Sequence, residues 1–439
     1  MVTWSELPDL MAVALLSSAF ASVARKSRTP VSGLWLTGWI MIVLHFAAFM
    51  FQEEPGLWGS LPITVGLVSL SWAGVLFMWA SVPYREEVSS RWMLAAMIGT
   101  NTLYIALNSL APASKALIPA AILYGAAPLA ITLIRLNRFT HPLRWILVAL
   151  YCALSIFLLS VQFRPGNGPD LAMDGVLFTV YFGCCLHFLW MHWRSTAGAF
   201  ITIAGFLAWA FVFVVAPLQE TFLPQFHPES GVWNLPKYVV AVGMILLLLE
   251  DQIEHNRHLA LHDVLTGLPN RRLFQDRLTS ALERARRTES QAALLVIDLD
   301  RFKKVNDTFG HHVGDLLLQR VGTLFASRVR RSDTVARTGG DEFSVVLEEP
   351  TSRNEAVHVG ESLMQLLRDP IDLGEHTVTI GASVGVAIFP QDANTSEALC
   401  IAADLKMYDY KNGSLGFSDR PSGRVEAEVA ALALQPESR

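Results

Sequence analysis

Nine apolar segments, each about as long as a bilayer core is thick, occupy the first 250 residues of this 439-residue chain. A helix that crosses the hydrocarbon core needs about 20 predominantly apolar residues. The fourth segment contains the polar Asn101, Thr102 and Asn108 and the ninth is short, so eight spans are an alternative to nine. The pattern predicts a multi-pass transmembrane α-helical bundle of about nine spans. The segments lie at about 8–24, 32–52, 60–82, 92–110, 115–134, 145–163, 171–191, 197–216 and 237–250.

Charge is distributed unevenly along the chain. Residues 1–250 hold 12 Lys and Arg with 11 Asp and Glu, whereas residues 251–439 hold 22 Lys and Arg with 28 Asp and Glu. All 12 tryptophans lie at or before Trp233. This split excludes a single globular core and indicates a membrane module, residues 1–250, followed by a soluble domain. The acidic balance of the soluble part, without a long basic run, argues against a nucleic-acid partner.

Basic residues between the apolar segments predict the orientation of the chain. With the N-terminus outside and nine spans, most of them fall in cytoplasmic loops, as the positive-inside rule requires. The C-terminal part then lies in the cytoplasm. The cytoplasmic set is Arg25, Lys26, Arg28, Arg85, Arg91, Arg135, Arg138, Arg144 and Arg194, and the outer set is Lys115, Arg164 and Lys237.

A few side chains of the membrane module invite a functional interpretation. His45, His187 and the pair Cys184–Cys185 could hold a cofactor, but a histidine in a membrane bundle is more often a hydrogen-bonded structural residue. Burying the Asp174 carboxylate inside a membrane costs free energy unless the carboxylate is paired or faces a cavity. Alternatively, Asp174 lies at the depth of the interface. The sequence does not identify a signal for this module.

The last apolar segment continues into a linker, residues 251–262, without Pro or Gly. A 3–4 spacing of side chains predicts a seam along one continuous helix. Asn256 is its one polar member, and two interpretations stay open. The linker is either a stalk that pairs with its twin in a dimer, or a rigid connector whose Asn256 faces water. The seam consists of Leu246, Leu249, Ile253, Asn256 and Ala260.

From Asp263 onward, helical and strand patterns alternate. No GxGxxG motif follows a strand, so the pattern predicts an α/β domain with a central sheet that is not a Rossmann fold. Residues 306–308 read as a polar loop. We expect helices at 272–289, 315–329, 352–368 and 395–411, and strands at 292–298, 333–338, 343–348 and 377–389, the last as one strand or a pair.

Two carboxylate clusters end two of these strands. Asp298 and Asp300 are two residues apart, so their side chains share one face of a strand. Asp341-Glu342 follows a Gly-Gly turn at Gly339 and Gly340, where glycine permits positive φ and lets a phosphate approach the backbone. Mg²⁺ usually binds through one or two carboxylates together with substrate phosphates.

One acidic pair alone would be a solvated turn. Here two clusters coincide, and Lys303 and Lys304 follow the first of them. The combination therefore favours a site for a metal ion and a nucleoside triphosphate.

Several ordered motifs between residues 263 and 413 resemble those of GGDEF-domain diguanylate cyclases. The resemblance implies a ferredoxin-like, polymerase-palm type domain at 263–416 that condenses two GTP into cyclic di-GMP and pyrophosphate with Mg²⁺ or Mn²⁺. It also implies a homodimer, because each protomer would hold one GTP. Together with the apolar segments, it predicts a multi-pass protein of the bacterial inner membrane. It does not cover residues 1–250. The motifs are Asp263–Arg272, Asp298–His311 with Gly314-Asp315, Arg337–Phe343 and Ala382–Val386.

The resemblance also implies roles for single residues. Asp298, the carbonyl of Leu299, and Asp341 or Glu342 would hold the metal ion, with Asp341 near the attacking 3′-hydroxyl. An amide and a carboxylate match the acceptor and donors of a guanine edge, which fits Asn306 and Asp315. The remaining residues implied to bind substrate are His311, Leu265, Leu318, Gly339, Gly340 and Lys411, of which Lys411 would reach the γ-phosphate. Arg330 and Asp333 have the spacing of an inhibitory site for cyclic di-GMP.

One departure from the family pattern affects the phosphate end. Leu415 stands where the family usually has an Arg, and one lost charge-assisted contact would cost about 1.5–3 kcal/mol. A second hypothesis is therefore a degenerate domain that binds GTP or cyclic di-GMP and signals through contacts. A third hypothesis, a transporter with an attached cyclase, has little support from the short loops. We expect no hydrolysis of cyclic di-GMP, because no EAL-type segment follows, and a flexible tail at 417–439.

Overall fold

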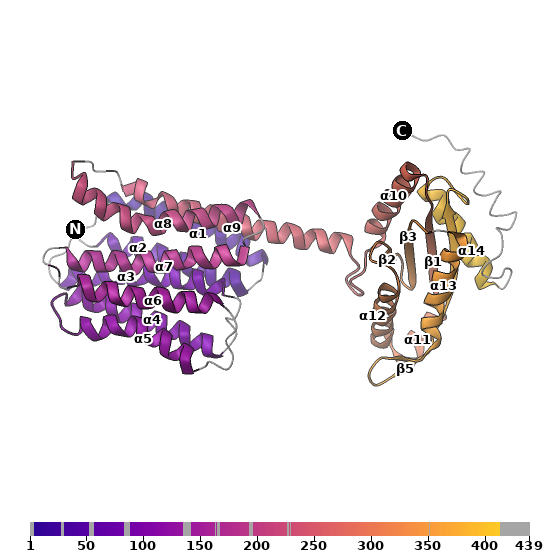
Figure 1. Cartoon of the computed structure of the whole chain (residues 1–439), viewed down its shortest axis with the longest axis horizontal. Coiled ribbons are helices and arrows are strands. Elements are labelled where there is room, and N and C mark those ends of the chain that lie inside the picture. The colour runs from indigo at the N-terminus through magenta and orange to yellow at the C-terminus, as the bar shows by residue number, and fades with distance from the viewer. Residues whose placement is uncertain are drawn as a thin grey trace. The chain divides into compact units, whose positions relative to one another are not determined.

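A computed structural model describes most of the chain in two compact units, Met1–Ile253 and Glu254–Arg439. Figure 1 shows the helices of the first unit and the strands and helices of the second. The boundary falls within the last helix of the first unit. The described residues are 4–27, 30–51, 57–82, 88–134, 142–162, 164, 167–192, 196–225, 228, 230–350 and 352–412.

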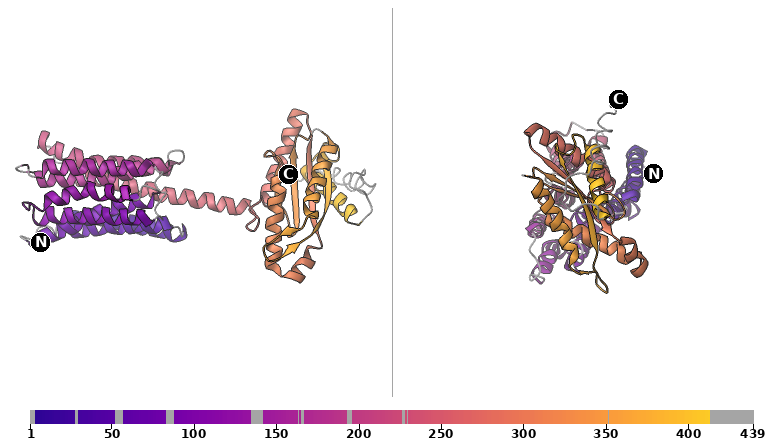
Figure 2. Two further views of the ribbon diagram at one scale, coloured as in Figure 1. Left: turned by 60° about the horizontal axis from the view of Figure 1, so that its bottom comes forward. Right: turned by 90° about the vertical axis from the view of Figure 1, so that its right-hand side faces the viewer.

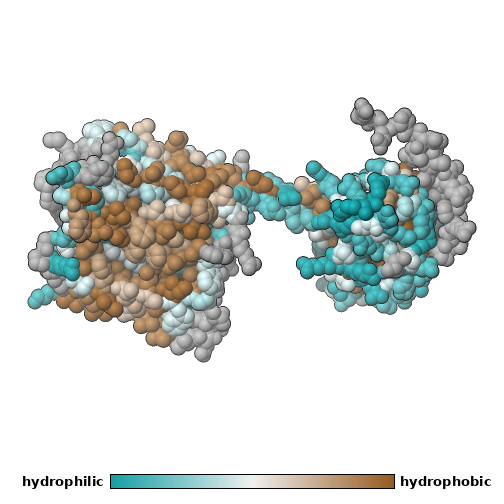
Figure 3. Space-filling view, turned by 45° about the horizontal axis from the view of Figure 1, so that its top comes forward, coloured by the Kyte–Doolittle hydropathy of each residue, from teal (hydrophilic) through white to brown (hydrophobic). Residues whose placement is uncertain are grey.

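Nine long apolar helices form the N-terminal unit within these described residues. Each is long and apolar enough to cross a membrane, and Figure 3 shows apolar side chains over much of the visible face of the bundle. Each predicted segment coincides with one helix, and the ninth is longer than expected. The elements are η1 (Trp4–Glu6), α1 (Leu7–Ser27), α2 (Pro30–Phe49), α3 (Leu57–Ala80), α4 (Val88–Leu110), α5 (Leu117–Ile134), α6 (Pro142–Val161), α7 (Gly168–His192), α8 (Ala197–Phe222) and α9 (Ser230–Leu261).

The polar residues of α4 connect it to neighbouring helices. Asn101 is fully buried, and its Oδ1 accepts hydrogen bonds from Ser71 on α3 and Tyr124 on α5, both at 2.9 Å. Trp72 Nε1 donates to Thr102 Oγ1, also at 2.9 Å. Interhelical hydrogen bonds of this kind stabilise helix pairs inside a membrane. The residues that weaken the apolar pattern of α4 are therefore contacts between helices.

The histidines and cysteines of the bundle make structural hydrogen bonds. His45 Nδ1 lies 2.9 Å from the carbonyl oxygen of Gly66, and His187 Nδ1 lies 2.8 Å from that of Gly183. Cys184 Sγ donates to a backbone carbonyl of α3 at 3.1 Å. These contacts agree with the structural interpretation of the side chains.

Two basic residues that the sequence assigns to loops are buried inside helices. Arg144 is fully buried near the start of α6, and Lys237 is 7% exposed in α9. The prediction that both are loop residues is wrong, because polar contacts inside a bundle can hold a charged side chain that sequence position alone puts at the surface. Arg144 belongs to the cytoplasmic set of basic residues and Lys237 to the outer set. Removing both therefore leaves the excess of basic residues on the cytoplasmic side unchanged.

The second unit has one four-stranded antiparallel sheet with strand order β2-β3-β1-β6. Strands and helices alternate as β-α-β-β-α-β, which is the ferredoxin-like order. Figure 2 shows the strands as one layer. Its elements are α10 (Arg271–Thr288), β1 (Ala292–Asp300), α11 (Phe302–Phe309), α12 (His311–Arg328), β2 (Thr334–Arg337), β3 (Glu342–Glu348), α13 (Arg353–Arg368), β4 (Ile371–Asp372), β5 (Thr377–Val378), β6 (Gly381–Phe389) and α14 (Ser396–Lys411).

The central strand β1 is buried on both faces. Leu295 and Ile297 pack in the core with residues of α12 and α13. Leu294 and Val296 pack on the opposite face with residues of α10 and α14. Side chains alternate between the faces along a strand, so Asp298 and Asp300 at the end of β1 emerge on the α10 and α14 side.

Three local predictions were wrong. Residues 306–308 belong to α11 rather than to a loop, α12 begins at His311 rather than at 315, and β4–β5 form a short hairpin that was not expected. The start of α11 carries no recognisable capping signal, because Arg301 at its N-cap has φ 59° and makes no side-chain hydrogen bond to the helix. Gly310, with φ 87°, separates α11 from α12.

Candidate active site

Three carboxylates from two segments of the chain meet at one end of the sheet. Asp298 on β1 and Glu342 on β3 are directly paired across the strands. The Leu299 N–H donates to the carbonyl oxygen of Asp341 at 3.2 Å, which fixes the turn against the end of β1. The Leu299 side chain is 1% exposed, so only its backbone can reach the site. Paired antiparallel residues project on the same face, so Asp298 and Glu342 can act on one ligand.

The ammonium of a lysine contacts one of these three carboxylates. Lys411 Nζ at the end of α14 lies 2.5 Å from Asp298 Oδ1. That hydrogen bond, aided by the negative charges of Asp298, Asp300 and Asp341, raises the pKa of Lys411. Ser383 Oγ donates to Asp300 Oδ1 at 2.7 Å. The end of the sheet is therefore a place where positive charge is stabilised.

The donor set suits a hard divalent cation with few protein ligands. No group of three or more His, Cys, Asp and Glu side chains that could hold a metal ion occurs among the described residues. Mg²⁺ commonly takes one or two carboxylates and completes its shell with water and phosphate oxygens. Asp298 with Glu342 or Asp341 fits that requirement, and Lys411 occupies the position of a cation beside Asp298.

The two glycines of the turn have different functions. The Glu342 carboxylate lies over Gly339, where a Cβ would be 2.6 Å from Oε2. A Cβ at Gly340 would have no atom within 4 Å. Neither residue is among the described glycines with positive φ, so the expectation of left-handed backbone here is wrong. A Cβ at Gly339 would therefore displace the Glu342 carboxylate from its present position.

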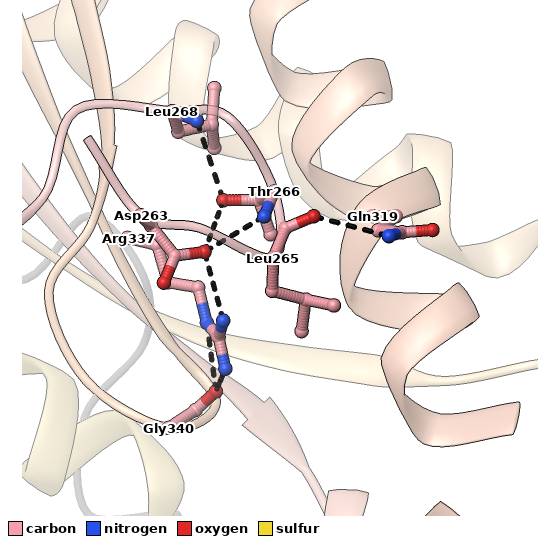
Figure 4. A network of polar contacts seen from close by, with 7 residues as sticks. All are labelled: Asp263, Leu265, Thr266, Leu268, Gln319, Arg337 and Gly340. Carbon is pink, nitrogen blue, oxygen red and sulfur yellow. Dashed lines mark hydrogen bonds and ion pairs between the residues drawn. The ribbon is translucent and has the colours of Figure 1, made fainter. Parts of the chain in front are cut away.

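Arg337 anchors the Gly339-Gly340 turn by hydrogen bonds to the carbonyl oxygen of Gly340, as Figure 4 shows. Arg337 donates from Nη2 and Nε to the carbonyl oxygen of Gly340 at 2.7 and 3.1 Å, and from Nη1 to Asp263 Oδ1 at 2.9 Å. Burial would raise the pKa of Asp263, but hydrogen bonds from Thr266 and Arg337 outweigh it and lower the pKa. This clamp was missed from sequence, although both residues stand in motifs already singled out there.

We expect Arg337→Met to lower kcat for any reaction at this site by about 10- to 100-fold, a range typical of groups that orient a metal or its ligands. The Gly340 carbonyl oxygen would lose both of its Arg337 hydrogen bonds. The turn would then no longer be tied to Asp263. A depressed carboxylate pKa contributes stability above the unfolded-state pKa and loses it as pH falls through the lower folded-state value. The clamp therefore persists at neutral pH.

Kinetic assays of Arg337→Met beside Arg320→Met, an exposed arginine on α12, measure this effect. An unchanged kcat for Arg337→Met, or an equal loss in both variants, would contradict the positioning role.

A second group of predicted residues surrounds the junction of α11 and α12. The Asn306 Oδ1 lies only 1.9 Å from the position that a Cβ of Gly314 would take. Gly314 therefore gives the amide its place beside Asp315, which is exposed in α12. His311 is exposed at the first position of α12. The structure thus brings Asn306, Asp315 and His311 to one junction.

Of the two leucines predicted to line a base pocket, Leu318 lies in the core and Leu265 packs against it. Leu318 is 2% exposed and belongs to the core cluster against which Leu265 packs. Gln319 Nε2 donates to the carbonyl oxygen of Leu265 at 3.1 Å, which ties the Asp263–Leu268 turn to α12 (Figure 4). Leu318 presents almost no surface in this structure, whereas Leu265 is partly exposed.

A pocket of about 1030 Å³ adjoins the carboxylates. Asp300, Arg301, Lys304 and Lys411 line it, so three cations and one carboxylate face the same space. Arg301 was not predicted as a site residue, although it lies in the Asp298–His311 motif; its left-handed backbone at the start of α11 was not expected from sequence. Leu415 and the tail at 417–439 lie outside the described residues.

Fold and site together define the class of this unit: an antiparallel α/β domain whose carboxylates and basic side chains meet at one end of its sheet. The family described as "Diguanylate cyclase, GGDEF domain" matches residues 260–414. The chain therefore contains a GGDEF domain with diguanylate cyclase homologues, and its N-terminal helices are consistent with a membrane module.

Individual relatives are similar over the same part of the chain. The bifunctional diguanylate cyclase/cyclic di-GMP phosphodiesterase MucR of Pseudomonas aeruginosa is 42% identical over 213 residues, which are 44% of this chain and 31% of MucR. The diguanylate cyclase TpbB of the same species is 40% identical over 197 residues, 43% of this chain and 45% of TpbB.

A solved structure of the TpbB GGDEF domain is 40% identical in sequence to the matching part of this chain. The match includes 35% of this chain and 91% of the solved chain, with a TM-score of 0.34. The chain spans less than half the length of both curated relatives.

Proposed function

We propose that this protein is a membrane-bound diguanylate cyclase that condenses two GTP into cyclic di-GMP and two pyrophosphates. The observation that carries the proposal is the meeting of Asp298, Asp341 and Glu342 with Lys411 at one end of the sheet. The names of the relatives support the same chemistry.

In the proposed reaction the protein positions one GTP for attack on a second. Asn306 would donate from its amide to guanine O6, and Asp315 would accept from the N–H groups of guanine N1 and N2, with His311 close by. Lys411, and Arg301 and Lys304 from the adjoining pocket, would neutralise the triphosphate. Asp341 would hold the proton of the attacking 3′-hydroxyl, as a positioned general base does. Asp298 and Glu342 would hold the metal ion.

A bound Mg²⁺ or Mn²⁺ would supply charge neutralisation at the phosphates. Because Lys411 is held by Asp298 in this structure, we expect metal and substrate to redirect its ammonium from the carboxylate to a phosphate oxygen. Two GTP molecules must face each other, so the active form would be a homodimer.

The N-terminal unit would anchor and regulate the enzyme. Nine spans with the N-terminus outside would place the catalytic domain in the cytoplasm, where GTP is found, and the basic residues between the spans support this orientation. The protein would reside in the bacterial inner membrane.

The test is a GTP turnover assay with the full-length protein in detergent or nanodiscs, with Mg²⁺ and with Mn²⁺. We expect cyclic di-GMP and pyrophosphate in a 1:2 ratio, and no product when EDTA is added. GTP binding without product under both metals would refute the cyclase proposal and favour the alternative, a GTP-binding or cyclic di-GMP-binding signalling module.

Product feedback would act through Arg330 and Asp333. The Arg330 guanidinium is exposed, 2.8 Å from Glu355 Oε1. The two Asp333 oxygens accept from the backbone N–H groups of Arg330 and Glu348 at 3.0 and 3.2 Å. Arg330 is thus free to exchange Glu355 for a phosphate, whereas Asp333 is also part of the fold.

We expect Arg330→Ala to raise the cyclic di-GMP concentration for half-inhibition by about tenfold, the effect of about 1.4 kcal/mol, with a similar initial rate. Inhibition curves of the parent, Arg330→Ala and the neighbouring Arg331→Ala measure it. Arg331→Ala serves as the matched surface control. Identical curves for all three would remove Arg330 from the inhibitory site.

A further inference from the structure

A partly open cavity of about 320 Å³ lies between helices of the N-terminal unit. Side chains of α2, α3, α7, α8 and α9 line it. Those of α2, α7 and α9 lie near the helix ends that the proposed orientation puts outside. Pockets for small molecules typically have volumes of about 300–1,000 Å³, so the cavity can hold a small metabolite.

One side of the cavity offers hydrogen-bond donors and a positive charge. The buried Lys237 ammonium donates to Asn234 Oδ1, and Asn234 Nδ2 donates in turn to Asp9 Oδ2 at 2.6 Å. Lys237 Nζ lies 4.7 Å from the centroid of the Phe46 ring. An ammonium has three donors, and Asn234 accepts only one. This network fixes the ammonium at the cavity wall.

A second donor on the same side has no partner. Trp209 is fully buried, and its Nε1–H makes no hydrogen bond to any described residue. Its ring lies 5.9 Å from Lys237 Nζ, and both side chains line the cavity. A buried donor without a partner is costly. The two groups together therefore favour a ligand that brings an anionic acceptor.

The α7 side of the cavity is acidic. Asp170 and Asp174 stand one helical turn apart on α7, and both line the cavity. The charges that act most on Asp174 are those of Asp170 and Glu220, which are also acids. Asp170 is exposed and Asp174 is half-buried, and like charges this close on one helix repel each other. A cationic group bound here would relieve that repulsion.

We propose that this cavity binds a small zwitterion of the α-amino acid class. Its carboxylate would accept from Lys237 and Trp209, its ammonium would face Asp170 and Asp174, and its side chain would pack against Trp233 and the other aromatic rings of the wall. A zwitterion satisfies both sides without carrying net charge into the bundle, which an ion of one sign cannot do.

The experiment measures binding alone, so its outcome is independent of the cyclase proposal. Purified full-length protein in detergent is titrated by calorimetry with the standard L-amino acids, one at a time at millimolar concentration. We expect saturable binding of at least one of them. Its analogues that lack either the carboxylate or the ammonium should bind at least tenfold more weakly.

Variants locate the site. Lys237→Gln, Asp174→Asn and Trp209→Phe should each weaken binding of that amino acid at least tenfold. Trp39→Phe is the matched control, because Trp39 is also buried with an unpaired indole N–H among the described residues but does not line the cavity. Should Lys237→Gln unfold, the other two variants leave the Asn234–Asp9 contact untouched and decide the question.

Absence of binding for every amino acid would overturn the proposal. Equal affinity in the cavity variants, or equal affinity for an analogue with one charge removed, would overturn it as well.

Discussion

Replacement of Asp341 by Ala is expected to lower the rate of cyclic di-GMP formation by about a thousandfold, within the range for loss of a general base. The change removes a carboxylate at the point where a 3′-hydroxyl must lose its proton. It leaves the fold of the turn in place, because Asp341 holds Leu299 through its backbone carbonyl rather than its side chain.

Product formation is measured by chromatography under saturating GTP and metal, and circular dichroism verifies folding. Asp307→Ala is the matched control, since Asp307 is an exposed acid on nearby α11. Turnover by Asp341→Ala within a few fold of the Asp307→Ala rate would exclude Asp341 from catalysis.

The second large effect concerns stability. We expect Gly385→Ala to destabilise the GGDEF domain by about 3 kcal/mol or more, at the upper end of the range for overpacked interiors. A Cβ at this position of β6 would lie 2.0 Å from the carbonyl oxygen of Ala403 and 2.4 Å from the backbone nitrogen of Met407. Both are backbone atoms of α14, so no side-chain rotation can make room.

The displaced helix carries Lys411 at its end, so phosphate binding should weaken together with stability. Hydrogen exchange of β6 and α14 amides in the full-length protein measures the opening free energy of this region. Gly340→Ala is the stability control, since a Cβ there meets no atom within 4 Å. Equal protection in both variants would show that α14 can move away from β6 at little cost.

Regions with a strong periodic pattern were predicted well. Each of the nine apolar segments coincides with one helix, and α10, β1, β3 and α14 begin and end within two residues of the expected positions. Their signals are local, since hydrophobic periodicity and length depend only on neighbouring residues. The short helix α11 was missed because Arg301 provides no side-chain cap.

Site residues that stand in one motif could be anticipated, whereas contacts between motifs could not. The pairing of Asp298 with Glu342 follows from the register of β1 against β3. The Asp263–Arg337 ion pair joins residues 74 positions apart. The place of the Asn306 amide depends on the missing Cβ of Gly314 on the next helix. None of these is encoded in the spacing of a single segment.

The sequence by itself determined a membrane-type helical module, an α/β domain of the GGDEF type and the residues that carry its chemistry. Those features rest on periodicity, composition and ordered motifs, all of which are local along the chain. The tertiary structure decided which side chains meet: Lys411 with Asp298, Arg337 with Gly340 and Asp263, and Lys237 and Trp209 with one cavity inside the bundle. Hydrogen bonds and charge interactions act over a few ångströms in space, so their partners depend on how the chain folds back on itself.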